Sequence, residues 1–161
     1  MFLYRVEVRV ATNPKMGLGL FAKEFISKDS VVWEFVDGLD IKISMDKFNT
    51  LNDAQKEYFI KYGWIQNGEE NFYYSSGDLS NFMNHSYNPN IKNTKIGDKI
   101  YGKTIKDIKK GDELTSNYDD NEYTLSYDEM LKVNYDDLHD VKEIKSSIPF
   151  FKYKITPKLF N

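Results

Sequence analysis

The chain has 161 residues, which is enough for one domain with a hydrophobic core and argues against two domains. Its formal net charge of -3 argues against a protein that binds nucleic acid through an overall positive charge. Because cysteine is absent, disulfides, thiol chemistry and cysteine-rich zinc sites are excluded.

Membrane insertion is also not expected from the sequence. No apolar run approaches the ~18 residues that a membrane-spanning helix needs. The first residues lack the pattern of a signal peptide. We therefore expect an intracellular protein, in the cytoplasm or in a host nucleus, with no membrane partner.

The first part of the chain has the apolar patterning of short β-strands. Glycines at 17 and 19 form a turn between the first two strands. We expect strands at residues 4–10, 20–21, 31–36 and 39–43. The third is an apolar run broken only by Glu34, so we expect it to be buried on both faces.

The apolar spacing changes between Ser44 and Tyr62. Apolar residues recur there every three or four positions, which predicts one or two short helices. Asn52 or Asp53 is expected to cap the second helix, and Gly63 stands where it should end.

Two β-hairpins are expected after these helices. The turn Asn67-Gly68 is expected to join residues 64–65 to 72–74. The turn Gly97-Asp98 is expected to join residues 91–96 to 99–105. The whole pattern predicts a fold that is mainly β with short helices (β+α).

The character of the chain changes after Tyr118. Ser126 and Glu129 form a capping box that predicts a short helix. Residues 138–144 give a second apolar helical face, and residues 151–155 alternate as a closing strand. We expect this tail to be structured.

The stretch Asn81–Asn90 is the part of the chain that folding alone explains least. It is rich in asparagine and contains one histidine and one proline, which is typical of a polar loop. Phe82 and Met83 precede Asn84-His85-Ser86 and are expected to bury the start of this loop. Polar groups held near a core need hydrogen-bond partners.

Three segments carry a resemblance to a known family. Residues 84–90, Asn-His-Ser-Tyr-Asn-Pro-Asn, resemble a signature of the SET-domain protein-lysine methyltransferases. Residues 17–22 and 108–118 resemble two further motifs of that family, in the family's order. The resemblance covers residues 4–120.

The resemblance implies a SET-domain fold of several small sheets with a knot-like C-terminal crossing. Residues 1–120 would be the SET catalytic domain. Residues 121–161 would be a C-terminal extension that packs on the domain and covers the active site, where relatives use zinc-held loops. The implied activity is S-adenosylmethionine-dependent methylation of lysine side chains in a protein, with a histone as the first candidate substrate.

Methyl transfer to lysine sets the requirements that the implied site must meet. A free lysine has a pKa of about 10.4, so the enzyme must supply a neutral amine and hold it in line with the methyl group. By resemblance the catalytic residue is Tyr118. The implied cofactor-binding residues are Met16, Gly17, Leu18, Gly19, Asn81, Phe82, Asn84, His85 and Tyr123. The implied substrate-channel residues are Phe35, Tyr74, Tyr87 and Ser116, and no metal site is implied.

Several alternatives stay open at this point. Asn81 stands where relatives commonly carry arginine, and Phe35 lacks the hydroxyl found in many relatives. Each channel tyrosine equally suits an ordinary core, and without the motif His85 would be interpreted as a core histidine. His139 is interpreted as a surface residue.

The partners also stay open. Residues 119–143 hold nine acidic residues against two lysines, and residues 92–110 hold seven lysines against two aspartates. An acidic rim would attract a basic, lysine-containing peptide such as a histone tail. The basic hairpin could contact an acidic partner, or nucleic acid only indirectly, and two solvated faces are an equally good interpretation of this charge pattern. A non-histone substrate, a catalytically inactive peptide- or cofactor-binding module and a homodimer are the remaining hypotheses.

Overall fold

The computed structural model describes residues 1–65, 71–97 and 99–118. The predicted turn at Asn67-Gly68, the turn residue Asp98, the cofactor residue Tyr123 and His139 lie outside these residues. The same holds for the predicted helices, strand and acidic rim of the C-terminal extension.

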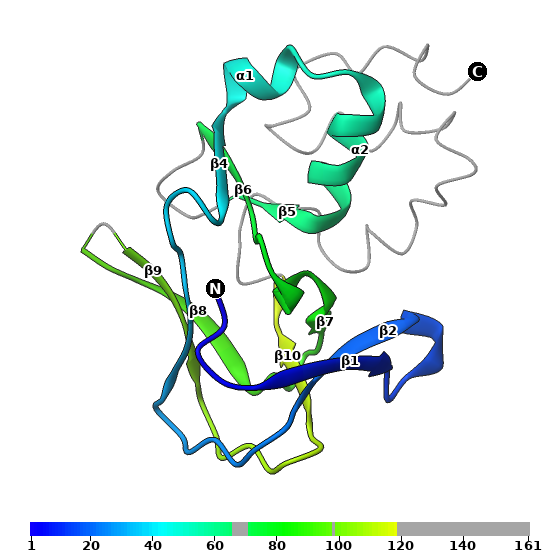
Figure 1. Ribbon diagram of the computed structural model, residues 1–161, viewed down its shortest axis with the longest axis vertical. Helices are drawn as coiled ribbons and strands as arrows, with labels where there is room; N and C mark the ends of the chain where they lie inside the picture. The colour runs from blue at the N-terminus through cyan, green and yellow to red at the C-terminus, as the bar shows by residue number, and fades with distance from the viewer. Residues whose placement is uncertain (66–70, 98, 119–161) are drawn as a thin grey trace.

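Short strands and a few short helices make up the described chain (Figure 1). The strands are β1 Val6–Val10, β2 Leu18–Ala22, β3 Val31–Glu34, β4 Ile41–Ser44, β5 Gly63–Trp64, β6 Phe72–Ser75, β7 Asn84–His85, β8 Ile91–Ile96, β9 Lys99–Thr104 and β10 Glu113–Ser116. The helices are α1 Met45–Asn49 and α2 Asp53–Tyr62, with the 3-10 helices η1 Pro14–Met16 and η2 Leu79–Phe82. The predicted class, mainly β with short helices, is confirmed.

The larger sheet has seven strands and brings together distant parts of the chain. Its order is β1-β2-β10-β8-β9-β3, and β7 pairs with β10 off this path. The β1–β2 and β8–β9 pairs are antiparallel hairpins, as the sequence predicts. β10, the last strand described, lies between β2 and β8 (Figure 1).

The smaller sheet packs with the two α-helices. Its strands run in the order β4-β6-β5, and all pairs are antiparallel. Asn52 and Gln55 form a capping box at the start of α2. The N–H of Gly63 bonds to the Phe59 carbonyl at the helix end. Both predicted helix ends are therefore confirmed.

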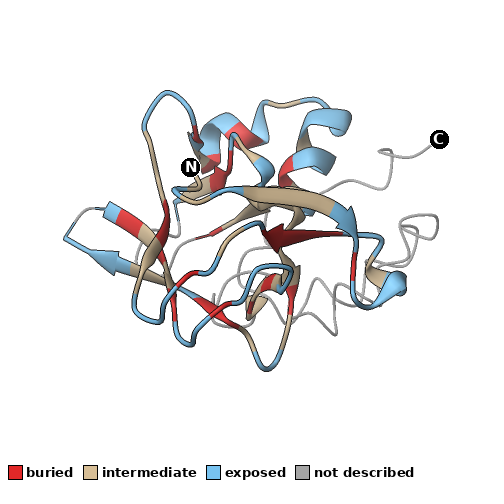
Figure 2. Cartoon of the chain, turned by 60° about the horizontal axis from the view of Figure 1, so that its bottom comes forward, coloured by how far each residue is buried: buried red, intermediate tan, exposed pale blue. Residues whose placement is uncertain are grey.

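Three apolar clusters form the interior, and the buried segments are spread over strands, helices and the loops between them (Figure 2). The first lies in the larger sheet, and Phe82 and Met83 pack against it, as predicted. The second joins the helices to the smaller sheet. The third contains Trp33 and Ile100 of the larger sheet and Tyr74 of the smaller one. It therefore links the two sheets.

Two strand predictions need correction. The third strand ends at Glu34 rather than at residue 36, and only Val32 and Trp33 within it are buried. Leu39 is 59% exposed and precedes the strand that the alternation predicted, which begins at Ile41. The reason is that Leu39 lies in a turn, where its N–H and that of Asp40 both donate to the Val36 carbonyl, whereas Ile43 within β4 packs against the second cluster as the alternation predicts. Among the described residues no helix is both long and apolar enough to cross a bilayer.

Candidate functional site

The two motifs at 84–90 and 108–118 meet through backbone pairing. β7 pairs with β10 in parallel, with Asn84 opposite Thr115 and His85 opposite Ser116. The pairing continues beyond the strand, because the N–H of Ser86 donates to the Ser116 carbonyl over 2.9 Å. This two-residue strand holds the Asn-His pair against the segment that ends at Tyr118.

Asn90 extends this contact through its side chain. Its Nδ2 donates to the Glu113 carbonyl at 2.7 Å, and its Oδ1 accepts from the Thr115 N–H at 2.9 Å. The side-chain amide therefore bonds β10 as the backbone of a neighbouring strand would. Asn90 is buried, which explains the need for both partners.

Tyr118 lies against both halves of the central motif. Its hydroxyl donates to the Met83 carbonyl oxygen at 2.6 Å. Its backbone N–H donates to His85 Nδ1 at 3.1 Å, and the two rings meet edge to face with centroids 5.4 Å apart. The hydroxyl proton is thus committed to the protein, and the hydroxyl oxygen keeps lone pairs that can accept a hydrogen bond from an amine.

The contact with Tyr118 also fixes the state of His85. Because Nδ1 accepts a hydrogen bond, the neutral ring carries its proton on Nε2. A charged imidazolium would place a second donor opposite the Tyr118 N–H and break this bond. The ring is buried and also meets the Tyr87 ring edge to face at 4.5 Å.

The glycine segment lies beside Asn84. Gly17 has φ +74°, a conformation that favours glycine. Asn84 Nδ2 donates to the Leu18 carbonyl at 3.0 Å and to Glu113 Oε1 at 2.9 Å. A Cβ added to Gly19 would stand 2.4 Å from that same Glu113 oxygen, so glycine leaves the room for the carboxylate. The motifs at residues 17–22, 84–90 and 108–118 therefore meet in one cluster of contacts around Asn84.

Glu113 is the charged member of this cluster. Partial burial works to raise the pKa of its carboxyl. Hydrogen bonds from Thr12 and Asn84 and the charge of Arg9 outweigh burial, so the pKa lies below its ordinary value. The Thr12 N–H donates to Oε2 at 2.8 Å, while Asn84 bonds Oε1. Glu113 is therefore an anion at neutral pH with both oxygens engaged.

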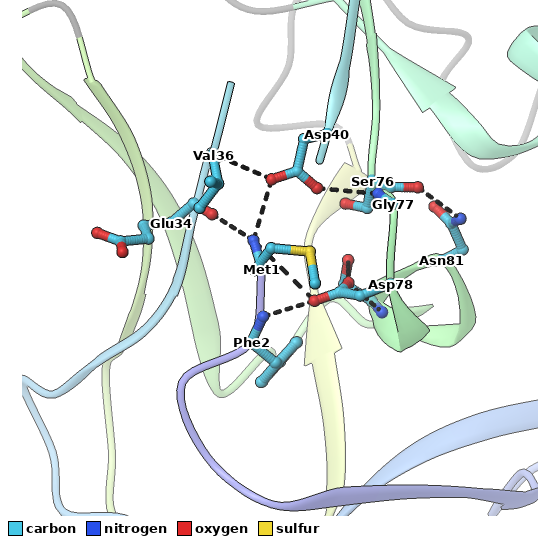
Figure 3. A network of polar contacts seen from close by, with 10 residues as sticks. Met1, Phe2, Glu34, Val36, Asp40, Ser76, Gly77, Asp78 and Asn81 are labelled. Atoms are coloured by element: carbon cyan, nitrogen blue, oxygen red, sulfur yellow. Dashed lines mark hydrogen bonds and ion pairs between the residues drawn. The ribbon is translucent and has the colours of Figure 1, made fainter. Parts of the chain in front are cut away.

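A polar network positions the segment that leads into the motif (Figure 3). Asp40 is buried and accepts from the N–H groups of Val36 at 2.8 Å and Gly77 at 2.9 Å. The Met1 ammonium lies 3.1 Å from its Oδ2. Asp78 caps η2 by accepting from the Ser80 N–H at 2.9 Å. The network thus ties the 77–82 turn to the loop between β3 and β4.

The predicted cofactor residues that the structure describes lie in the glycine segment, in the central motif and in the turn that leads into it. Asn84 bonds the Leu18 carbonyl, Gly19 lies against Glu113, which the sequence did not predict as a site residue, and Met16 ends η1 immediately before Gly17. Phe82 packs against the first apolar cluster. Asn81, which replaces an expected arginine, donates its amide to the Ser76 carbonyl at 3.0 Å and so holds the turn rather than pointing out as a free cation would. Their cofactor role stays a prediction.

The predicted channel residues lie in two groups. Phe35 and Tyr74 meet edge to face at 5.6 Å in the third core cluster, where Tyr74 also stacks on Trp64. Ser116 pairs with His85, and Tyr87 contacts the His85 ring with 64% of its own surface exposed. Tyr74 is 2% exposed, so its ring is part of the hydrophobic core.

Sequence reasoning missed two carboxylates. Glu113 belongs to the third motif, but only the tertiary structure places it against Thr12 and Asn84. Asp40 gave no signal beyond its position in a turn after Gly38, yet its side chain has no exposed surface. Among the residues described, no three of His, Asp and Glu gather in a way that could hold a metal ion.

A model of the SET domain matches residues 17–119 of the chain. No match was found among curated proteins. The matched range contains the glycine segment, the central motif and Tyr118, and therefore the whole cluster of contacts around Asn84 and His85.

The fold is also similar to solved structures. The Polycomb Repressive Complex 2 of Chaetomium thermophilum matches with a TM-score of 0.56 and 26% identity, over 71% of this chain and 15% of that chain. A humanized mutant of that complex bound to the inhibitor GSK343 matches with a TM-score of 0.58 and 26% identity, over 73% and 15%. A ctPRC2 structure in an autoinhibited conformation bound to S-adenosylmethionine gives 0.57 and 26%, over 73% and 15%. The chain thus spans only 15% of the length of these chains.

Proposed function

The chain belongs to the SET-domain family, and from that premise we propose that it transfers methyl groups from S-adenosylmethionine to lysine side chains of a protein. The observation that carries the proposal is the position of Tyr118. Its hydroxyl bonds the Met83 carbonyl and its N–H bonds His85, which fixes both the ring and the direction of the hydroxyl. A site for positioning an amine needs such a fixed acceptor.

The residues around Asn84 fit the cofactor. The Leu18 side chain is 47% exposed, and a Cβ on Gly17 would meet no atom within 4 Å, so this turn is open to a ligand. When bound, S-adenosylmethionine supplies a methyl group on a positively charged sulfur. The chain would hold it with residues 16–19, Asn84 and His85, and Tyr123 would cover it.

Tyr118 would act on the substrate amine by orienting it. Because the hydroxyl donates its proton to Met83, its oxygen can accept a hydrogen bond from a neutral lysine amine. A neutral amine is favoured where a nearby positive charge and an apolar wall disfavour the ammonium form. Aromatic side chains such as Phe35, Tyr74 and Tyr87 are our candidates for that wall, with Ser116 beside them.

We propose a histone as the protein substrate. The similarity to Polycomb Repressive Complex 2 structures supports this choice. So does the acidic sequence at 119–143, which suits a basic peptide. A nuclear location would follow, and a homodimer is compatible with this scheme.

We also propose that residues 121–161 pack on the domain and cover the site. Support comes from Val10 and Leu18, which are paired across β1 and β2 and are 64% and 47% exposed. These apolar side chains lie at the proposed cofactor segment, and burying them under another part of the chain would stabilise the protein by removing apolar surface from water.

The test is methyl transfer from labelled S-adenosylmethionine to core histones, to a mixed lysate and to buffer alone. Wild type is compared with Tyr118→Phe and with the control Tyr101→Phe, which removes a hydroxyl from β9. We expect labelled histone with wild type and the control, and a rate lower by roughly 10²-fold with Tyr118→Phe.

The other outcomes separate the remaining hypotheses. Label that appears only in lysate would move the substrate to another protein. Measurable cofactor binding with no label in any mixture would contradict catalysis and favour a binding module.

A further inference from the structure

Asn84 uses both of its amide hydrogens inside the protein. One acceptor is the Leu18 carbonyl at 3.0 Å and the other is Glu113 Oε1 at 2.9 Å. Neither acceptor can donate, so the NH₂ group must face them and the amide cannot be turned over. The amide oxygen therefore points away from both partners, and in the part of the chain that the structure describes it receives no hydrogen bond.

Glu113 enforces this orientation together with the Leu18 carbonyl, and it is the partner whose side chain can be changed. Its carboxylate has no proton to give, because hydrogen bonds and Arg9 keep it ionised. Its other oxygen is held by the Thr12 N–H at 2.8 Å, which prevents the carboxylate from swinging away from Asn84. The missing Cβ at Gly19 gives it the space to stand there, since an added Cβ would lie 2.4 Å from Oε1.

We infer that Glu113 is a positioning residue for the cofactor: by fixing the Asn84 amide, it makes the Asn84 oxygen an acceptor for the ammonium group of the bound ligand. This inference rests on the proposed function. An acceptor oxygen with an anionic carboxylate beside its amide suits a cationic donor. In S-adenosylmethionine the cationic hydrogen-bond donor is the α-ammonium, because the sulfonium carries no hydrogen on sulfur.

The substitution Glu113→Gln keeps the shape of the side chain but removes its negative charge and one of its two acceptor oxygens. Glutamine has one oxygen and one NH₂ group, whereas Glu113 accepts from two donors. If its oxygen stays with Thr12, its NH₂ faces Asn84, and the Asn84 amide must turn over to give it an acceptor. Asn84 then presents NH₂ to the ligand ammonium, and two donors face each other.

Glu24→Gln is a matched control. Glu24 also accepts from a backbone N–H of the first hairpin, that of Arg5 at 2.9 Å, and its pKa is likewise lowered, by hydrogen bonds from Arg5. The control makes the same change in charge and in backbone hydrogen bonding at a half-buried position, where the side-chain partner is Arg5 and not an asparagine.

The experiment measures dissociation constants by calorimetry for two ligands. S-adenosylhomocysteine carries the α-ammonium, and 5′-methylthioadenosine keeps the adenosine and the sulfur but lacks the amino-acid part. For Glu113→Gln we expect S-adenosylhomocysteine to bind roughly 10- to 100-fold more weakly, and methylthioadenosine to bind as it does to wild type. Glu24→Gln should bind both ligands as wild type does.

An equal loss for both ligands would overturn the inference, because it would mark Glu113 as a general structural support. Unchanged binding of S-adenosylhomocysteine would overturn it as well. If Glu113→Gln does not fold, Glu113→Asp keeps the charge, draws the carboxylate back by one methylene, and should show the same selective loss. Failure of wild type to bind S-adenosylhomocysteine would refute the cofactor assignment itself, which distinguishes that failure from a wrong role for Glu113.

Discussion

Asn90 shows how one side chain can replace a strand. Its amide donates to Glu113 and accepts from Thr115, two residues apart on β10. Its own N–H donates to the Thr115 carbonyl at 3.2 Å. The residue therefore closes the loop after β7 against the strand that carries the site.

Replacing Asn90 with alanine should destabilise the fold. Two partly buried backbone groups lose their partners, and we expect about 2 to 4 kcal/mol of lost free energy of unfolding. Urea denaturation at neutral pH measures it. Asn88→Ala is the control from the same loop, because within residues 1–65, 71–97 and 99–118 the Asn88 side chain bonds only exposed Lys106, and it should cost less than about 0.5 kcal/mol. Equal losses in the two variants would contradict this account of Asn90.

At the scale of elements, Asp40 joins the loop before β4 to the turn before η2. Its carboxylate accepts from Val36, Gly77 and the Met1 ammonium, all from different segments (Figure 3). Because the side chain is fully buried, each of these bonds lies in a medium where an unpaired group is costly. The turn it holds leads directly into the central motif.

Asp40→Asn should therefore weaken this junction. The amide has one acceptor for donors that approach both carboxylate oxygens, so at least one donor would face NH₂. We expect a loss of about 2 to 4 kcal/mol in the free energy of unfolding, measured by urea denaturation. Asp46→Asn, at an exposed position in the first turn of α1, should change it by less than about 1 kcal/mol. A loss no larger than that of the control would refute the role assigned to Asp40.

The cluster between the helices and the smaller sheet predicts a response to alkaline pH. Phe48 stacks on Tyr73 with centroids 4.5 Å apart, and burial raises the pKa of the Tyr73 hydroxyl to about 12. An unfolded tyrosine ionises near ~10, so folding favours the protonated form. Its contribution to stability is complete below the unfolded pKa and is lost as pH rises through about 10 toward 12.

Tyr73→Phe should remove this sensitivity. Between pH ~8 and ~11 wild type should lose about 1.4 kcal/mol of unfolding free energy that the variant keeps. Urea denaturation of both proteins at the two pH values measures the difference, with Tyr101→Phe as the control. An identical pH dependence in wild type and Tyr73→Phe would show that this hydroxyl titrates as an exposed one does.

For the whole molecule, local patterns predicted local structure well. The capping box at Asn52, the helix end at Gly63 and the β8–β9 hairpin follow from residues close in sequence. The packing of β10 between β2 and β8 could not be derived in this way, because it pairs residues that are far apart along the chain. The resemblance anticipated that these motifs meet, but not how.

The site was predicted unevenly for the same reason. Asn84, His85 and Tyr118 were singled out through their motifs, and the structure brings them together, while their roles stay predictions. The role of Glu113 depends on Thr12, an exposed residue with no motif of its own, so no local pattern could reveal it. Asp40 was missed because a buried aspartate in a turn has the same sequence pattern as an exposed one.

The most direct test of lysine methylation is tandem mass spectrometry of histones H3 and H4 after incubation with the protein and S-adenosylmethionine. We predict added methyl groups on one or a few lysine side chains, present with wild type and Tyr101→Phe and strongly reduced with Tyr118→Phe. Methyl groups on residues other than lysine, or methylation that Tyr118→Phe leaves unchanged, would contradict the central claim that Tyr118 and the Asn84-His85 strand form a lysine methyltransferase site.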